Sequence, residues 1–341
     1  MKRNPENFSK QRESEEESLP KMEIEKEPHY IIMITRHAER LPSGELSPEG
    51  IAHGKVKGEK LNDVEVLKSY ASDHPSKRTY ETAENISEGA NIKSPLTGER
   101  YKTRTVKGIQ YDVLEPTILK TAKLLIEEKT LDEINEKYPE LAKLISSALE
   151  EDTSGLLTKT NSQGESMVDI EKLSKDIQRQ IAPIRQKNQK IGFEKILDNP
   201  NTVRNMAVGL SHQLIDKEKI LTRYSNDRNK KNVPVKKDVV ININTHGLFV
   251  ESLLRSSGIF VKPDGEIIHG IDNMDNDDLG GYIQPAESIY LDIGTDPNNI
   301  PEQIPVVFES GRNINGKVYL DRSKLEQLNR DYSVGKNMEQ K

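Results

Sequence analysis

An arginine, a histidine and a second arginine follow a short apolar run near the start of the chain. The run, Tyr30 to Thr35, has the length and composition of a buried strand, and Arg36, His37 and Arg40 come directly after it. An imidazole nitrogen can attack phosphorus while guanidinium groups hold the phosphate oxygens. The segment therefore predicts phosphoryl chemistry, although a solvated Arg-His pair at a basic strand end would have the same sequence.

Arg78 occupies a second junction between a predicted strand and a predicted helix. The strand candidate covers residues 64–71, a polar loop with His74 follows, and a helix is expected over 77–87. A helix amino terminus supplies N–H groups and the positive end of the helix dipole, both of which favour a bound phosphate. Arg78 is therefore predicted to bind phosphate, the alternative being a helix-face arginine paired with a nearby glutamate.

A third junction of this kind contains a second histidine. Residues 239–244 form an apolar strand candidate, His246 follows it, and residues 247–256 have a helical pattern. His212 also follows an apolar stretch and competes for the same role. The strand before His246 is longer and the helix after it is clearer, so His246 is preferred.

Strands and helices alternate along much of the chain. This pattern predicts an α/β three-layer sandwich, with a mostly parallel central sheet flanked by helices and with helical insertions. The loops at the strand ends would gather along one sheet edge, where Arg36, His37, Arg78 and His246 can meet. That convergence carries the functional prediction further than any single residue does.

The chain is predicted to comprise a charged head, one elaborated domain and a tail. Residues 1–28 are almost without apolar side chains and are expected to be disordered. The domain is expected over residues 29–325, with insertions around 89–160 and 190–237, and residues 326–341 form a tail. We expect the insertions to form a lid over the crevice and to choose the substrate.

Caps and prolines predict the helix boundaries. Ser47 and Pro48 suit the N-cap and the first position of a helix that runs to about residue 61. Pro183 is expected to end or kink a later helix that begins near Gly164. The other helices expected from periodicity cover residues 118–149, with a break at Tyr138-Pro139, and residues 208–224.

Composition limits the class of protein. The chain has 341 residues and a net charge of -6, which disfavours a general nucleic-acid or anionic-membrane surface. The absence of cysteine excludes disulfides, thiolate catalysis and cysteine-based zinc sites. Neither a signal segment nor an apolar run long enough to span a membrane is evident, so a soluble cytoplasmic protein is expected.

Three segments resemble motifs of the histidine phosphatase superfamily, to which phosphoglycerate mutases and acid phosphatases belong. They are residues 34–39, with Ala38 where the motif has glycine, residues 72–83, and residues 245–247. The resemblance implies a metal-independent phosphomonoester hydrolase in which His37 carries the phosphoryl group as phosphohistidine and water then releases phosphate. No cofactor is expected.

The resemblance also implies roles for the other basic residues. Arg36 and Arg78 would hold phosphate oxygens, and His246 would donate a further hydrogen bond as charge develops. Arg40 and Pro42 complete an Arg-His-X-X-Arg-X-Pro pattern similar to that of the acid phosphatase and phytase branch, where the later arginine also binds phosphate.

The proton donor for the leaving group remains open. The acid phosphatase branch has an aspartate directly after its second histidine, whereas this chain has Gly247. The mutase-like branch uses a carboxylate downstream of the second arginine, and Glu115 lies in the segment that most resembles it. The other candidates are Asp112, Glu99 and Glu39.

The sequence is also compatible with two functions other than a phosphatase. A phosphomutase of the phosphoglycerate mutase type would use the same histidine but return the phosphoryl group to a bound acceptor, in a pocket that excludes water. A catalytically inactive homologue would keep the arginines and bind phospholigands. We expect a small-molecule or peptide phosphomonoester as the partner, with no nucleic acid and no membrane, and the sequence leaves the oligomeric state open.

Overall fold

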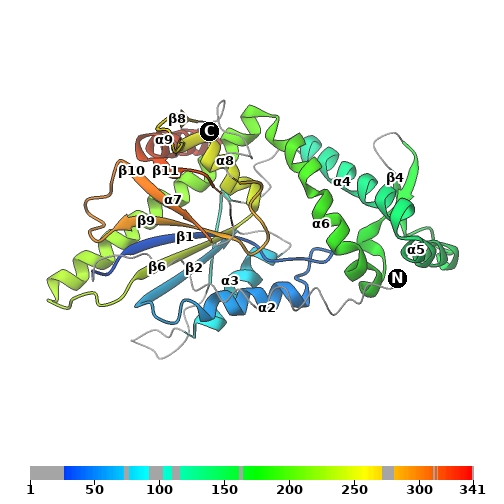
Figure 1. Ribbon diagram of the computed structural model, residues 1–341, viewed down its shortest axis with the longest axis horizontal. Coiled ribbons are helices and arrows are strands. Elements are labelled where there is room, and N and C mark those ends of the chain that lie inside the picture. Colours follow the sequence, from blue (N-terminus) through cyan, green and yellow to red (C-terminus); the bar gives the residue numbers. More distant parts are fainter. Residues whose placement is uncertain are drawn as a thin grey trace.

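A mixed β-sheet with helices on both faces forms the body of the protein (Figure 1). The computed structural model describes residues 27–72, 77–91, 103–109, 116–160, 164–270, 280–309, 312 and 314–339, so most of the predicted charged head lies outside the described residues. Nine strands of the described residues form this sheet, in the spatial order β3 (Arg104–Val106), β2 (Val66–Ser72), β6 (Val239–Thr245), β1 (Tyr30–Arg36), β9 (Ser288–Gly294), β10 (Gln303–Phe308), β11 (Lys317–Asp321), β7 (Gly258–Val261) and β8 (Ile267–His269).

The directions of these strands correct the prediction of a mostly parallel sheet. Only the four strands β3, β2, β6 and β1 pair in parallel, and every pairing from β9 to β8 is antiparallel. A parallel neighbour needs a crossover of a dozen or more residues. The connections from β9 to β10 and from β10 to β11 are shorter than that, so these strands can only turn back on one another.

Helices pack on both faces of the sheet (Figure 1). One face is covered by α7 (Pro200–Lys230), α8 (Gly247–Ser257) and α9 (Arg322–Glu339), and the other by α2 (Pro48–Glu59) and α3 (Arg78–Ala90). Successive side chains of β1 point to opposite faces of the sheet, so this strand packs against both helical layers. Ile32 and Ile34 belong to the main core with α7 and α8, whereas Ile31 and Met33 belong to a smaller core with Ile86 of α3.

The helix boundaries that depend on local chemistry lie where they were predicted. Ser47 is the N-cap of α2, and its hydroxyl accepts a hydrogen bond of 3.0 Å from the backbone N–H of Gly50, with Pro48 at the first helical position. Tyr138 separates α4 (Pro116–Lys137) from α5 (Pro139–Glu151), which confirms the expected break.

The helix expected from Gly164 begins later and does not stop at Pro183. It is α6 (Lys175–Leu197), preceded by β5 (Ser166–Val168), which pairs with β4 (Thr158–Thr160), and by the 3₁₀ helix η2 (Ile170–Lys172). The side chain of Ser174 caps α6 by accepting from the N–H of Ile177, which sets the later start. Ile181 and Ile184 are buried on either side of Pro183, so packing outweighs the cost of a proline inside the helix.

The region expected as an insertion around 190–237 contains α7, a helix of 31 residues that packs into the main core. Polar side chains on its buried face obscure the apolar pattern in the sequence. Ser211, for example, is fully buried and donates a hydrogen bond of 2.6 Å to the carbonyl of Leu325. That carbonyl lies in α9, and residues 326–339, which were expected as a tail, continue this helix.

The region from 116 to 197, here called the cap, lies beside the sheet (Figure 1). It holds α4, α5 and α6 and has a hydrophobic core of its own. The buried members of that core are Ile134, Leu141, Ile145, Ile170, Leu173, Ile181 and Ile184. In the parts of the chain that the structure describes, no helix is both long enough and apolar enough to cross a bilayer.

Candidate active site

Three neighbouring parallel strands bring the predicted basic residues together. β6 lies between β2 and β1, and Arg36 at the end of β1 is in register with Thr245 at the end of β6. His37 and His246, the next residue of each strand, therefore lie side by side, with ring centroids 5.2 Å apart in an edge-to-face arrangement. Arg78 opens α3 beyond β2 and places Nη2 3.4 Å from Nδ1 of His246.

A cavity of about 200 Å³ lies over these residues, between the sheet edge and the cap. Four of its lining residues, Arg36, His37, Arg40 and Arg78, are among those expected from the sequence. His246 is fully buried and is not one of the lining residues, but it contacts two of them, His37 and Arg78. The geometry thus brings together the residues whose convergence was predicted.

The surroundings of His37 favour a neutral imidazole. Its Nδ1 lies 2.8 Å from the carbonyl oxygen of Ala38, which can only accept, so Nδ1 carries the proton and Nε2 keeps its lone pair. The pKa of His37 lies well below its ordinary value, mainly because the ring is buried. The positive charges of Arg78, Arg36 and Arg40 lower it further. This tautomer is the one that a nucleophile requires.

Backbone and hydroxyl contacts fix the loop that carries His37. The N–H of His37 donates to the carbonyl of Thr245 at 2.9 Å, which joins the loop to β6. The N–H of Ala38 donates to Oγ1 of Thr82 at 3.0 Å, and that hydroxyl donates in turn to the carbonyl of Arg78 at 2.8 Å. The nucleophile candidate and the second arginine are therefore positioned by the same buried threonine.

The guanidinium of Arg36 is held by groups from two other elements. Nη1 donates to the carbonyl of Ile283, Nη2 donates to Oε1 of Gln189 on α6 at 2.5 Å, and the group lies 5.2 Å from the ring centroid of Phe193. Glu251 of α8, which is fully buried, accepts a hydrogen bond of 2.8 Å from the N–H of Ile283. This buried carboxyl group therefore supports the segment that fixes Arg36.

The position after His246 has no room for a side chain. A Cβ on Gly247 would lie 2.9 Å from Cδ and 3.3 Å from Nε of Arg36. An aspartate at this position would therefore require the Arg36 side chain to move from its present place.

Of the candidate proton donors, the structure describes only Glu39. Glu99, Asp112 and Glu115, and also His74, lie outside the described residues. Glu39 lies in the loop after His37, but its carboxylate faces α2, where both oxygens lie within 3.0 Å of Nδ1 of His53.

His212, the competing second histidine, lies elsewhere. It is on α7, where its ring stacks on Tyr332 with centroids 4.0 Å apart and its Nδ1 lies 2.9 Å from Oδ1 of Asn329. The preference for His246 at the strand end agrees with this placement.

The cap contributes cavity residues that sequence reasoning missed. They include Lys123 of α4, Glu171 of η2 and Gln189 of α6. The pKa of Lys123 is lowered mainly by burial. The charge of Glu171 opposes this shift, and the nearby arginines add to it. For α6, the sequence does contain a pattern that could have indicated these contacts, namely polar residues at helical spacing. The pattern can be recognised only when the helix is given its true start and end.

Among the described residues, no group of three or more His, Asp or Glu side chains could hold a metal ion. Comparison with known proteins finds no matching family model and no matching curated protein.

Several solved structures are similar to the chain at low identity. Hafnia alvei phytase is 11% identical, with a TM-score of 0.43, over 89% of this chain and 96% of the phytase. The phytase of Klebsiella sp. ASR1 is 15% identical, with a TM-score of 0.38, over 89% and 84% of the two chains. A mycobacterial glucosyl-3-phosphoglycerate phosphatase is 14% identical, with a TM-score of 0.33, over 82% and 96%. At this level of similarity the geometry of the site has to carry the assignment of function.

Proposed function

We propose that this chain is a phosphomonoester hydrolase of the histidine phosphatase superfamily, and that His37 is its nucleophile. One observation carries the proposal: a neutral imidazole with its Nε2 lone pair unprotonated lines the same cavity as three guanidinium groups, those of Arg36, Arg40 and Arg78. A phosphate monoester dianion is the ligand whose charge and shape suit such a cavity.

The proposed reaction has two displacements at phosphorus. Nε2 of His37 forms a bond to phosphorus as the bond to the ester oxygen breaks, and the leaving alkoxide takes a proton from a general acid. Water then attacks the phosphohistidine and gives a proton to the conjugate base of that acid, its oxygen bonds to phosphorus, and the P–N bond breaks to return the neutral imidazole and inorganic phosphate. The donor of the first proton remains one of the carboxylates outside the described residues.

The cationic groups would act mainly on the transition state. Arg36 and Arg78 would hold the equatorial oxygens, where charge is spread during the transfer. Arg78 can only donate, so Nδ1 of His246 accepts from it and Nε2 of His246 carries a proton. That N–H would donate to a phosphate oxygen or stabilise the geometry around it.

The test is a labelling experiment on wild type and His37→Ala. Each protein is mixed briefly with a ³²P-labelled phosphomonoester, denatured, and assayed for protein-bound label that is lost in acid. We expect acid-labile label and released phosphate from wild type and neither from the variant. Turnover without labelling, or activity in the variant, would refute the mechanism. Label that passes to an added alcohol rather than to water would indicate a mutase, and binding without label or turnover an inactive homologue.

A further inference from the structure

The loop that follows His37 is a closed hairpin whose tip touches the cap. Arg40 pairs with Leu46 in a β-bridge, and the N–H of Leu41 donates to the carbonyl of Glu45 at 2.8 Å. A turn closes the tip, where the N–H of Gly44 donates to the carbonyl of Leu41 at 2.9 Å, and Gly44 has a positive φ of 95°. Ser43 and Gly44 at this tip line the cavity.

Two buried side chains of α6 hold the tip of the hairpin. Arg185 donates from Nη1 to the carbonyl of Pro42 at 2.9 Å, and Gln178 accepts from the N–H of Ser43 at 2.9 Å through Oε1. Gln178 is itself fixed, because its amide nitrogen donates to the carbonyls of Glu171 and Leu173. Both contacts use backbone groups of the hairpin, so they fix its position.

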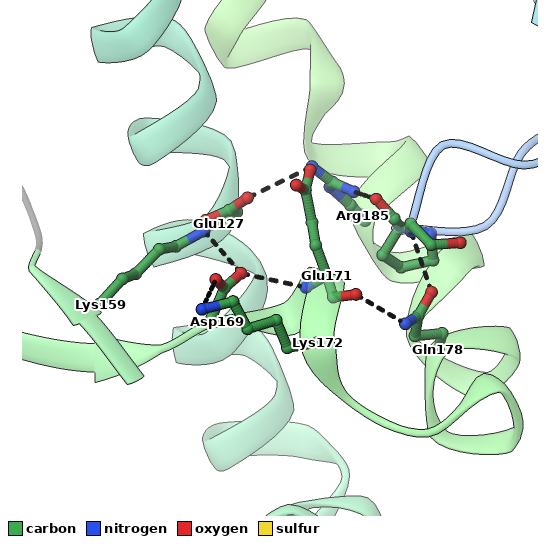
Figure 2. Close-up of polar contacts among 9 residues, drawn as sticks. Glu127, Lys159, Asp169, Glu171, Lys172, Gln178 and Arg185 are labelled. Carbon is green, nitrogen blue, oxygen red and sulfur yellow. Dashed lines mark hydrogen bonds and ion pairs between the residues drawn. The ribbon is translucent and has the colours of Figure 1, made fainter. Parts of the chain in front are cut away.

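Arg185 is oriented by a partly buried network of alternating charges (Figure 2). Its Nη2 lies 3.3 Å from Glu127 and 3.2 Å from Glu171, and the Glu127 side chain is only 2% exposed. Lys159 pairs with Glu127 and also with Asp169 at 3.1 Å, and Lys172 lies 3.5 Å from Asp169. Three acids and three bases balance, so the network needs no further ion to be neutral.

Gln178, Arg185 and Gln189 lie along one side of α6. They are spaced by seven and four residues, which places them on the same helical face. Gln178 and Arg185 hold the hairpin, while Gln189 accepts from Arg36. One helix of the cap therefore contacts both the arginine before His37 and the hairpin after it.

We propose that Arg185, oriented by Glu127 and Glu171, is a positioning residue that fixes the Arg40–Leu46 hairpin and so keeps the phosphate cavity in its binding geometry. The proposal rests on the proposed function, because it assigns a role in that same site. In this role Arg185 need not touch phosphate itself. It acts through the carbonyl of Pro42, two residues after Arg40, and through the docking of the cap on the sheet edge.

The experiment compares four variants with wild type. Arg185→Met removes the donor and the charge, and Arg185→Lys keeps the charge but cannot span Pro42 and both glutamates. The double variant Glu127→Gln/Arg185→Met removes one charge of each sign, so the network stays balanced and the cap keeps its fold. Arg179→Met is the control, because Arg179 lies on the same helix but is 53% exposed and forms a surface ion pair with Asp176.

The readouts separate positioning from folding. The Kd for inorganic phosphate is measured by calorimetry, and kcat and KM are measured with p-nitrophenyl phosphate, beside thermal unfolding. We expect Arg185→Met and the double variant to raise Kd and KM about ten-fold or more, Arg185→Lys to fall between them and wild type, and the control to stay within about two-fold. A merely structural residue would lower the folded fraction, and hence kcat, with Kd and KM unchanged.

A wild-type Kd and KM in the folded double variant would overturn the proposal. Because Kd is read without turnover, the proposed function and the positioning role can fail separately. Phosphate binding that weakens in the Arg185 variants supports the positioning role even if wild type hydrolyses no ester. A wild type that binds no phosphate would overturn both.

Discussion

Glu251 offers a test of the buried support behind Arg36. This carboxyl is fully buried in α8, and burial raises its pKa to about 8, against the opposing effects of the Ile283 N–H and Arg36. In the unfolded chain the pKa returns to about 4.3. The perturbation is Glu251→Gln, which keeps an oxygen to accept from Ile283 but cannot ionise.

The sign follows from proton binding. Between about pH 4.5 and pH 8 the folded state holds a proton on Glu251 that the unfolded state has lost, so stability falls as the pH rises through this interval. At 1.36 kcal/mol per pKa unit, the full loss is about 3 to 5 kcal/mol. It is complete above pH 8 and absent below pH 4.

The assay is urea unfolding of wild type and Glu251→Gln at pH 5.5 and pH 9. The variant lacks this pH-dependent contribution, so its stability relative to wild type should increase by about 2 to 4 kcal/mol between the two pH values. Glu136→Gln is the control, because Glu136 is exposed on α4. A difference between wild type and Glu251→Gln that does not change with pH would show that Glu251 does not carry the linked proton.

Three other variants have defined outcomes. Arg78→Lys loses the planar fork beside His246 and should raise KM for a phosphate ester about ten-fold, with the circular dichroism spectrum unchanged; an unchanged KM would remove Arg78 from the phosphate site. Gly209→Ala places a Cβ 1.6 Å from the carbonyl oxygen of Gly108 and should lower the free energy of unfolding by about 3 kcal/mol; a neutral effect in urea would contradict this close packing. Ser47→Ala removes the α2 cap and should cost about 1 kcal/mol by the same measurement, so a loss under a few tenths would count against the cap.

The parts of the site that were predictable from sequence have local causes. An apolar run that ends at Arg36, and another that ends before His246, mark strand ends without any knowledge of the fold. Parallel pairing then places such ends at one edge, which is why the convergence could be predicted. The cap of α2 by Ser47 and the break at Tyr138 likewise depend on a few adjacent residues.

The parts that were missed depend on contacts between distant residues. Pro183 continues a helix because Ile181 and Ile184 are buried against the rest of the cap, and propensity alone carries no trace of that packing. The polar face of α6 is connected to the site by its contacts with the hairpin after His37, which join residues far apart in the sequence. The antiparallel half of the sheet follows from short connections late in the chain, whereas the alternation earlier in the chain suggested a parallel sheet.

The close approach of Gly247 to Arg36 limits how this architecture can be redesigned. An enzyme designer who wished to install an acid beside the second imidazole would also have to reposition the Arg36 side chain, because a Cβ at position 247 would lie 2.9 Å from its Cδ. Redesign at this one position would therefore alter two parts of the site at once.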